Sequence, residues 1–169
     1  MVVINLGFTA PINRPGESPL SAAQVWQGLK RKVRHAEEFV PVITDCEVLD
    51  EKTTETGEEV VTRTVKFAAR SGPKGGGVPV KEVCYHYAPC RVDFQQEDES
   101  RISNFVTSGA SNNPEDLCLT YVFEWRHPGV DEGSDNAREL EEQHRKTAQM
   151  AVESSIKTIR RLVEEGKIA

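Results

Sequence analysis

The final segment of the chain most constrains the fold, because it predicts one long amphipathic helix. Ser134 and Asp135 are good capping residues for its start, and the helix is expected to end near Glu165. Its apolar and small residues recur on one stripe: Leu140, Ala148, Ala151, Val152, Ser155, Ile159 and Leu162. Charged residues occupy the other faces. A helix of this kind must bury its stripe against another layer of structure.

A second helix is expected near the start of the chain. Ser21 can cap it, and Pro41 prevents its continuation. The apolar positions at three-and-four spacing are Ala22, Val25, Trp26, Leu29 and Val33. A strand over residues 2–8 precedes it, separated from it by a turn-rich stretch with three prolines.

The middle of the chain reads as an antiparallel meander. Five strands are expected over approximately 42–49, 59–68, 80–87, 91–96 and 117–127. Residues 101–107 either continue the fourth of these strands or form a separate one. The glycine-rich stretch 71–77 predicts a mobile hairpin loop between two strands. The pattern therefore predicts an α+β domain in which a curved antiparallel sheet is wrapped around the long C-terminal helix.

Composition narrows the classes of function. A chain of 169 residues with 37% hydrophobic residues predicts a single domain over residues 1–169. No apolar stretch approaches a membrane span and no secretory leader is visible, so we expect a cytoplasmic protein. A net charge of −6 argues against nucleic acid as a partner. The four cysteines are dispersed and no metal-ligand spacing occurs, so neither a metal nor a cofactor is expected.

Small side chains on the long helix predict a cavity between this helix and the sheet. Ala148, Ala151 and Ser155 leave space that a curved sheet does not fill. Concave, mostly apolar sites with a few polar groups are where small molecules bind. We therefore expect the residues that line this cavity to be the functional ones.

The order of elements resembles the helix-grip fold of the SRPBCC superfamily. This superfamily includes START lipid-transfer domains, polyketide aromatase/cyclases and birch-pollen-allergen proteins. Within it, Gln24-Val25-Trp26-Gln27-Gly28-Leu29, then Glu38-Phe39-Val40, then the helix from Ala148 to Arg161 are similar to the AtaL-like family. That family was long described as a domain of unknown function, and its fungal members often accompany secondary-metabolite clusters. The resemblance implies an internal ligand pocket, but it brings no catalytic residue set.

The strand over 117–127 carries an aromatic face. Alternate residues share that face: Leu119, Tyr121, Phe123, Trp125 and His127. This face should point inward, where Tyr121 adds a polar group that can orient a ligand. It either lines the pocket or is simply part of the core, and Trp26 on the first helix has the same two alternatives.

Arg63 stands among Val61, Val65 and Phe67 on the apolar face of its strand. Burying an unpaired charge costs several kcal/mol. Arg63 should therefore either meet a carboxylate or carbonyl partner, or bind an anionic or carbonyl-bearing ligand. A register slip of one residue would instead turn its neighbours inward.

Cys84 and His86 share one strand face. Side chains two apart on a strand are roughly 6 to 7 Å apart, too far for an activated thiolate. His86 can still act as a general acid or base if it faces a pocket; otherwise it is a hydrogen-bonded wall residue or faces solvent. His35 ends the first helix beside a basic cluster that includes Lys32, which either attracts an anion or complements the helix C-terminus.

Three functions are compatible with these observations. The first is a cofactor-independent cyclase, isomerase or dehydratase of secondary metabolism, in which Arg63 stabilises an enolate while His86 or Tyr121 moves a proton. The second is a non-catalytic carrier of a lipid or intermediate, and the third is an interaction module with a filled interior. The expected ligand-binding residues are Trp26, Val61, Val65, Phe67, Cys84, Leu119, Phe123, Trp125, His127, Ala148, Ala151, Val152 and Ser155. The expected partner is a hydrophobic small molecule, and the chain is either a monomer or a homodimer.

Overall fold

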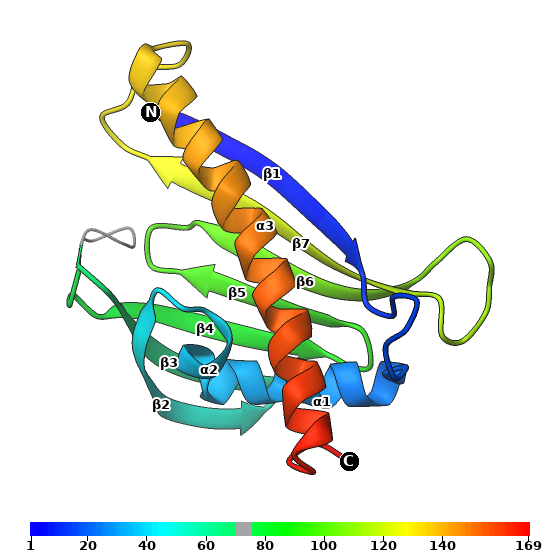
Figure 1. Ribbon diagram of the computed structural model, residues 1–169. Coiled ribbons are helices and arrows are strands. Elements are labelled where there is room, and N and C mark those ends of the chain that lie inside the picture. The colour runs from blue at the N-terminus through cyan, green and yellow to red at the C-terminus, as the bar shows by residue number, and fades with distance from the viewer. Residues whose placement is uncertain (70–75) are drawn as a thin grey trace.

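The computed structural model describes residues 1–69 and 76–169 (Figure 1). Its elements, in chain order, are β1 (Val2–Pro11), α1 (Ala22–Arg34), α2 (Ala36–Phe39), β2 (Ile43–Thr53), β3 (Glu59–Phe67), β4 (Val80–Tyr87), β5 (Arg91–Gln96), β6 (Arg101–Ser108), β7 (Leu117–His127) and α3 (Asp135–Glu164). Most of the predicted glycine-rich loop, residues 71–75, lies outside the described residues.

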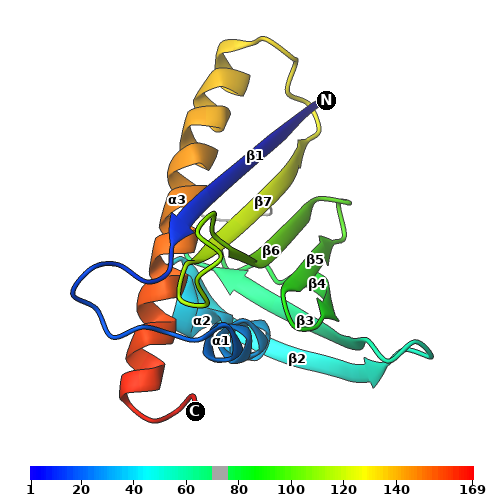
Figure 2. The same cartoon turned by 90° about the vertical axis from the view of Figure 1, so that its right-hand side faces the viewer.

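One antiparallel sheet forms the body of the protein. Its seven strands follow the order β1-β7-β6-β5-β4-β3-β2, so β1 and β2 are the two edges. Helix α3 crosses one face of the curved sheet, and α1 and α2 lie beside its C-terminal half (Figures 1 and 2). The predicted helix-grip α+β fold is confirmed.

Strand β6 is a separate element. It pairs with β5 on one side and β7 on the other, so of the two alternatives for residues 101–107 the structure contains the separate strand. Six strands therefore follow residue 42, where five were counted with that segment left open. A tight turn reverses the chain between β5 and β6, with Glu99 at φ 67° and a backbone hydrogen bond from Gln96 to Ser100. The N-terminal strand is also longer than predicted and ends at Pro11. A proline is tolerated there because β1 is an edge strand.

Helix α1 begins with a capping box and ends at Arg34, with His35 as its C-cap residue, which is the end that the sequence predicts. The Ser21 hydroxyl accepts a hydrogen bond from the Gln24 amide at 3.2 Å, and the Gln24 side chain accepts one from the Ser21 amide at 3.0 Å. The short α2 then precedes Pro41. Arg63 of β3 donates hydrogen bonds to the carbonyls of Lys32 and Val33 in the last turn of α1, so a tertiary contact holds this end of the helix.

The core lies between the inner face of the sheet and the two long helices. The predicted stripe of α3 is buried from Ala148 to Leu162, while Leu140 is half-buried. Helices α1 and α3 approach closely, since a Cβ atom on Gly28 would lie 2.4 Å from Ile159 Cγ1. Among residues 1–69 and 76–169, no helix combines the length and apolarity that a membrane crossing requires.

Candidate functional site: buried polar groups on the inner face of the sheet

A row of inward side chains crosses the sheet from β4 to β7. The strand register aligns His86 with Val92, Val92 with Asn104, and Asn104 with Tyr121. Adjacent strands are about 4.8 Å apart, so Asn104 and Tyr121 are direct neighbours and His86 is two strands from Asn104. The row faces α1 and α3, where the core is otherwise apolar.

The polar side chains of this row are buried without protein partners. The atoms concerned are His86 Nε2, the Tyr121 hydroxyl and both amide atoms of Asn104. The three residues are 3%, 1% and 0% exposed, respectively. A buried polar group without a hydrogen bond costs about 1–3 kcal/mol, and native proteins contain few of them. Their concentration in one row marks this part of the core as a candidate ligand site.

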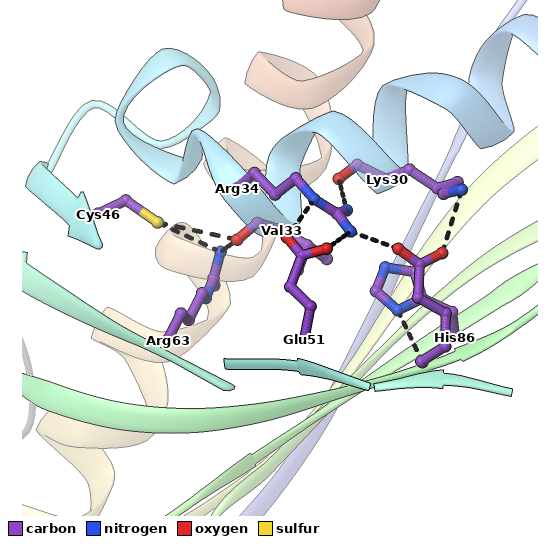
Figure 3. A network of polar contacts seen from close by, with 8 residues as sticks. Lys30, Val33, Arg34, Cys46, Glu51, Arg63 and His86 are labelled. Atoms are coloured by element: carbon purple, nitrogen blue, oxygen red, sulfur yellow. Dashed lines mark hydrogen bonds and ion pairs between the residues drawn. The ribbon is translucent and has the colours of Figure 1, made fainter. Parts of the chain in front are cut away.

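The tautomer of His86 follows from its surroundings. Its Nδ1 lies 3.1 Å from the Glu59 carbonyl oxygen, so Nδ1 carries the proton and donates it (Figure 3). Nε2 is then a free acceptor. Burial lowers the pKa of His86, while the bond to the Glu59 carbonyl opposes this shift. The ring of Trp26 stands edge-on to His86, with centroids 6.2 Å apart. His86 is therefore a neutral base at one end of the row.

Tyr121 remains a neutral phenol. Burial raises its pKa, and the neighbouring Ser155 hydroxyl on α3 partly opposes that shift. Ser155 itself donates a hydrogen bond to the Ala151 carbonyl at 2.7 Å. The Tyr121 hydroxyl lies beside Ser155 but has no hydrogen bond of normal geometry. It can therefore donate to an oxygen of a bound molecule.

Lys32 reaches into the same region from α1. It is only 6% exposed, and its Nζ lies 4.0 Å from the centre of the Tyr121 ring and 5.5 Å from that of Phe94. Because these rings belong to β7 and β5, the amine stands above β6, the strand of Asn104. Burial lowers the pKa of Lys32 to about 7; the charge of Arg63 adds to the shift and Glu82 opposes it.

Arg63 points inward as predicted and has a structural partner. Its Nε and Nη2 donate to Glu82 Oε2 at 2.8 and 2.6 Å, and both side chains are 4% exposed. Its Nη1 donates to the carbonyl of Lys32 at 2.9 Å and to that of Val33 at 2.8 Å. Figure 3 shows the bond to Val33. Burial alone would lower the pKa of Arg63, but Glu82 raises it. Of the two alternatives for Arg63, the structure contains the carboxylate partner.

Cys84 is not poised as a nucleophile. It is fully buried, and burial raises the pKa of its thiol to about 12. A thiolate is therefore not populated near neutral pH. Cys84 contributes apolar surface next to Phe94, its register partner on β5.

The other predicted ligand-binding residues divide into three groups. Most belong to the main core cluster, which also contains Tyr121: Trp26, Val61, Leu119, Phe123, Ala148, Ala151 and Val152. Ser155 is fully buried beside Tyr121. Val65 and Phe67 belong to a second, smaller cluster with Ala36, Ile43 and Val80. Trp125 and His127 are half-buried near the start of α3.

The rings of Phe123, Trp125 and His127 on β7 form an aromatic stack with His144 of α3. The Trp125 ring lies between Phe123 and His144, with centroid distances of 4.4 and 3.9 Å. The Nε2 atoms of His127 and His144 are 2.8 Å apart. Burial and the neighbouring His127 lower the pKa of His144 to about 4. This end of the sheet is closed by ring packing.

Sequence reasoning missed Lys32, Asn104 and Glu82. Lys32 was assigned to a surface basic cluster, but it follows Leu29 by three positions and so continues the apolar stripe of α1. Asn104 alternates with Ile102 and Val106 on β6, and Glu82 alternates with the buried residues of β4. The period-two signal for both was present in the sequence.

The surface part of the basic cluster is paired with carboxylates. Lys30 Nζ lies 3.1 Å from Glu59, and Arg34 binds both Glu51 and Glu59 (Figure 3). Arg31 binds Glu38 at 2.7 Å. A groove of about 590 Å³ lies between these residues of α1 and the C-terminal residues 167–169. Its cations are therefore largely neutralised.

A second hollow, of about 200 Å³, lies between β1 and α3. Its lining includes Gly7, Phe8 and Ala148. Phe8 is the register partner of Tyr121, so this hollow is beside the β1 end of the polar row. Among the described parts of the chain, no group of three or more metal-ligating side chains is present.

With the geometry established, comparison with known proteins identifies the family. The family model described as "Acetylaranotin biosynthesis cluster protein L" matches residues 6–166. This chain belongs to the AtaL family. The Aspergillus terreus protein of that name is 28% identical over 163 residues, which cover 96% of this chain and 91% of the relative. The resemblance inferred from the motifs of α1 and α3 is confirmed.

Solved structures similar to this AtaL-family protein confirm the fold. The Zhui aromatase/cyclase from Streptomyces has a TM-score of 0.56 and 18% identity, with 96% of both chains covered. The di-domain aromatase/cyclase StfQ of the steffimycin pathway has a TM-score of 0.66 and 10% identity. The match covers 98% of this chain but only 52% of StfQ, so this chain spans about half the length of StfQ. A START superfamily protein from Mycobacterium smegmatis has a TM-score of 0.60 and 9% identity, covering 95% of this chain and 98% of that one.

Proposed function

We propose that this AtaL-family protein binds a hydrophobic, oxygen-bearing small molecule of secondary metabolism and promotes its cyclisation, isomerisation or dehydration without a cofactor. The row of buried, unpartnered polar atoms on His86, Asn104 and Tyr121 carries this proposal. An apolar interior with a few aimed polar groups is the usual form of a small-molecule site. A ligand with oxygen atoms would supply the hydrogen bonds that the fold does not.

The chemistry of the row assigns a role to each of its members. Tyr121 donates a proton or a hydrogen bond to an oxygen, and the Asn104 amide can bind a carbonyl through its NH₂ group. His86 Nε2 accepts a proton at the other end. Arg63 donates its hydrogen bonds to Glu82 and to the Val33 carbonyl of α1. We therefore assign it the role of positioning α1 against the sheet, in place of direct enolate binding.

The apolar wall of the site is proposed to be the main core cluster that surrounds the row. Val65, Phe67, Trp125 and His127 lie at its periphery, in the second cluster and in the aromatic stack. We propose that the ligand enters beside β1, where the hollow between β1 and α3 adjoins Phe8 and Ala148. The edge strand β1 is held to the sheet by β7 alone, which makes it the natural element to move.

The comparisons support this function. The Aspergillus terreus relative is named for the acetylaranotin biosynthesis cluster. Two structural neighbours, Zhui and StfQ, are described as aromatase/cyclases. These names associate the family and the fold with secondary metabolism and ring-forming chemistry.

Incubation with intermediates of the neighbouring pathway, followed by mass spectrometry, tests the proposal. Conversion should fall at least tenfold for Tyr121→Phe and for Asn104→Leu, because each removes a polar group from the row. Val122→Thr is the matched control, since Val122 is on β7 but is 44% exposed on the opposite face. Unchanged turnover in Tyr121→Phe, Asn104→Leu and His86→Phe would refute the catalytic role.

A non-catalytic carrier is the second candidate. The geometry of Arg63 favours it, because an arginine paired with Glu82 is not free to stabilise an enolate. Protein purified from its host would then release, on solvent extraction, a hydrophobic molecule that the purified protein does not alter. Recovery of a converted product after incubation would instead favour the enzyme.

A further inference from the structure

Lys32 is the only buried lysine among residues 1–69 and 76–169. The lysine two positions earlier on α1, Lys30, has a side chain that is 34% exposed and forms an ion pair with Glu59. Lys32 has no comparable hydrogen bond or ion pair within the described residues. The nearest carboxylate in the core, Glu82, is already bonded to Arg63 and to Gln96. An amine with no carboxylate partner is an unusual occupant of a core.

The surroundings of the Lys32 amine are rings and unpartnered polar atoms. Its Nζ stands over β6, between the Phe94 and Tyr121 rings. Asn104, the register partner of Tyr121 on β6, has both amide atoms unpartnered, and Tyr121 carries an unpartnered hydroxyl. A carbonyl group placed here would meet hydrogen-bond donors at its oxygen and an amine at its carbon.

We propose that Lys32 forms an imine with the carbonyl carbon of an apolar aldehyde or ketone held in this interior. This inference rests on the proposed function and names both the class of substrate and the covalent residue. Imine formation by a desolvated lysine is an established form of nucleophilic catalysis.

The reaction balances without any further reactant. The lone pair of the neutral amine adds to the carbonyl carbon, and the π electrons move to the oxygen, which takes a proton as the nitrogen loses one. The resulting carbinolamine loses its hydroxyl group and the second nitrogen proton as water, which leaves a carbon–nitrogen double bond. Protonation of that nitrogen makes the neighbouring C–H bonds more acidic, as ring closure or dehydration of a carbonyl compound requires.

The protonation state of Lys32 suits this step. With its pKa lowered to about 7, half of the amine is neutral at pH 7. An exposed lysine, with a pKa near 10.4, is neutral in only about one molecule in 2,500 at that pH. The groups that face Lys32 are Arg63, Glu82, Cys84 and Tyr121, from β3, β4 and β7. Of these, the charge of Arg63 favours the neutral amine.

Reductive trapping tests the inference with a defined probe. The full chain is incubated at pH 7 with 2-naphthaldehyde and sodium cyanoborohydride, and the adduct is located by intact mass and peptide mapping. Among the lysines, we expect the naphthylmethyl adduct on Lys32, formed at least a hundredfold faster than on any other; peptide mapping separates it from modification of the exposed N-terminal amine. Trapping relative to a free lysine reference should fall about tenfold between pH 6 and pH 8, because the neutral fraction of Lys32 rises about tenfold while that of the free lysine rises about a hundredfold.

Matched variants separate chemistry from folding. Lys32→Arg keeps the cation but cannot form an imine, so the adduct should disappear while the circular dichroism spectrum is unchanged. Lys30→Met removes the neighbouring lysine of α1 and should leave the adduct unchanged. Asn104→Leu keeps the amine but removes the carbonyl-binding amide, and should slow trapping at least fivefold.

Binding of 2-naphthalenemethanol, which lacks the carbonyl, distinguishes the imine inference from the proposed pocket function. It is followed by tryptophan fluorescence. If this alcohol binds and Lys32 is not modified faster than Lys30, the imine inference is overturned while the pocket function stands. If neither compound binds, both are overturned. Selective modification of Lys32, lost in Lys32→Arg, supports both.

Discussion

The buried ion pair between Arg63 and Glu82 predicts a large loss of stability when Glu82 is replaced by Gln. This substitution keeps the size of the side chain but removes the negative charge from two hydrogen bonds of 2.6 and 2.8 Å. The guanidinium then remains buried without a negative charge beside it, and the carbonyls of Lys32 and Val33 still accept its Nη1 hydrogen bonds. Breaking a buried pair typically costs 3–5 kcal/mol; because these carbonyls remain, we expect about 3 kcal/mol.

Urea denaturation followed by circular dichroism measures this loss. With a slope of about 2 kcal/mol/M, a loss of about 3 kcal/mol lowers the midpoint by about 1.5 M. Asp45→Asn is the matched control, because it breaks the Lys66–Asp45 pair on the neighbouring strands, whose side chains are 42% and 53% exposed. An exposed pair contributes at most about 1 kcal/mol. If Glu82→Gln cost no more than Asp45→Asn, the assignment of Arg63 to a structural ion pair would be wrong.

Three further outcomes follow from the core. Lys32→Met should raise the free energy of unfolding at pH 7 by about 2–4 kcal/mol. The folded pKa of Lys32, near 7, is below the unfolded value, so the lysine costs stability at low pH and this cost shrinks as pH rises. The stability of the Met variant should therefore rise less between pH 7 and pH 8.5 than that of the unchanged protein. Equal pH slopes in both proteins would contradict this. His144 has a folded pKa near 4, also below its unfolded value, so stability should fall by about 1–2 kcal/mol as pH drops from 6.5 to 4. His144→Phe should reduce that loss, as measured by urea titration of both proteins at the two pH values. Gly28→Ala should destabilise by about 1–2 kcal/mol in thermal melts because its Cβ would meet Ile159 at 2.4 Å, and Ile159→Ala should reduce that cost; additive losses would show that the contact is not the cause.

The periodicities of the chain predicted its layers well. The stripe of α3, the Ser21 cap of α1 and the aromatic face of β7 all follow from local sequence spacing, and the structure has them. Contacts between distant residues were missed. Arg63 of β3 donates hydrogen bonds to carbonyls in the last turn of α1, and no local signal in either segment predicts that contact.

The candidate site was only partly predictable, for the same reason. Alternation predicted that Arg63 and Tyr121 point inward, and both are buried. It left open whether His86 faces the interior or solvent, and His86 is buried. It could not show that Arg63 meets Glu82, since that pairing depends on the register of β3 against β4. Lys32 was read as one member of a charged run, although its position after Leu29 places it on the buried side of α1.

By itself, the sequence determined the order of elements, the inward faces of the strands and the family, because helical and strand periods and short motifs are local properties of the chain. Tertiary structure decided which polar side chains are satisfied. Strand register gave Arg63 its carboxylate, and the packing of α1 against the sheet placed Lys32 over the Tyr121 ring without one. Hydrogen bonding and desolvation depend on neighbours far apart in the chain, so the polar groups of this interior that lack partners are decided only when the sheet and its helices pack together.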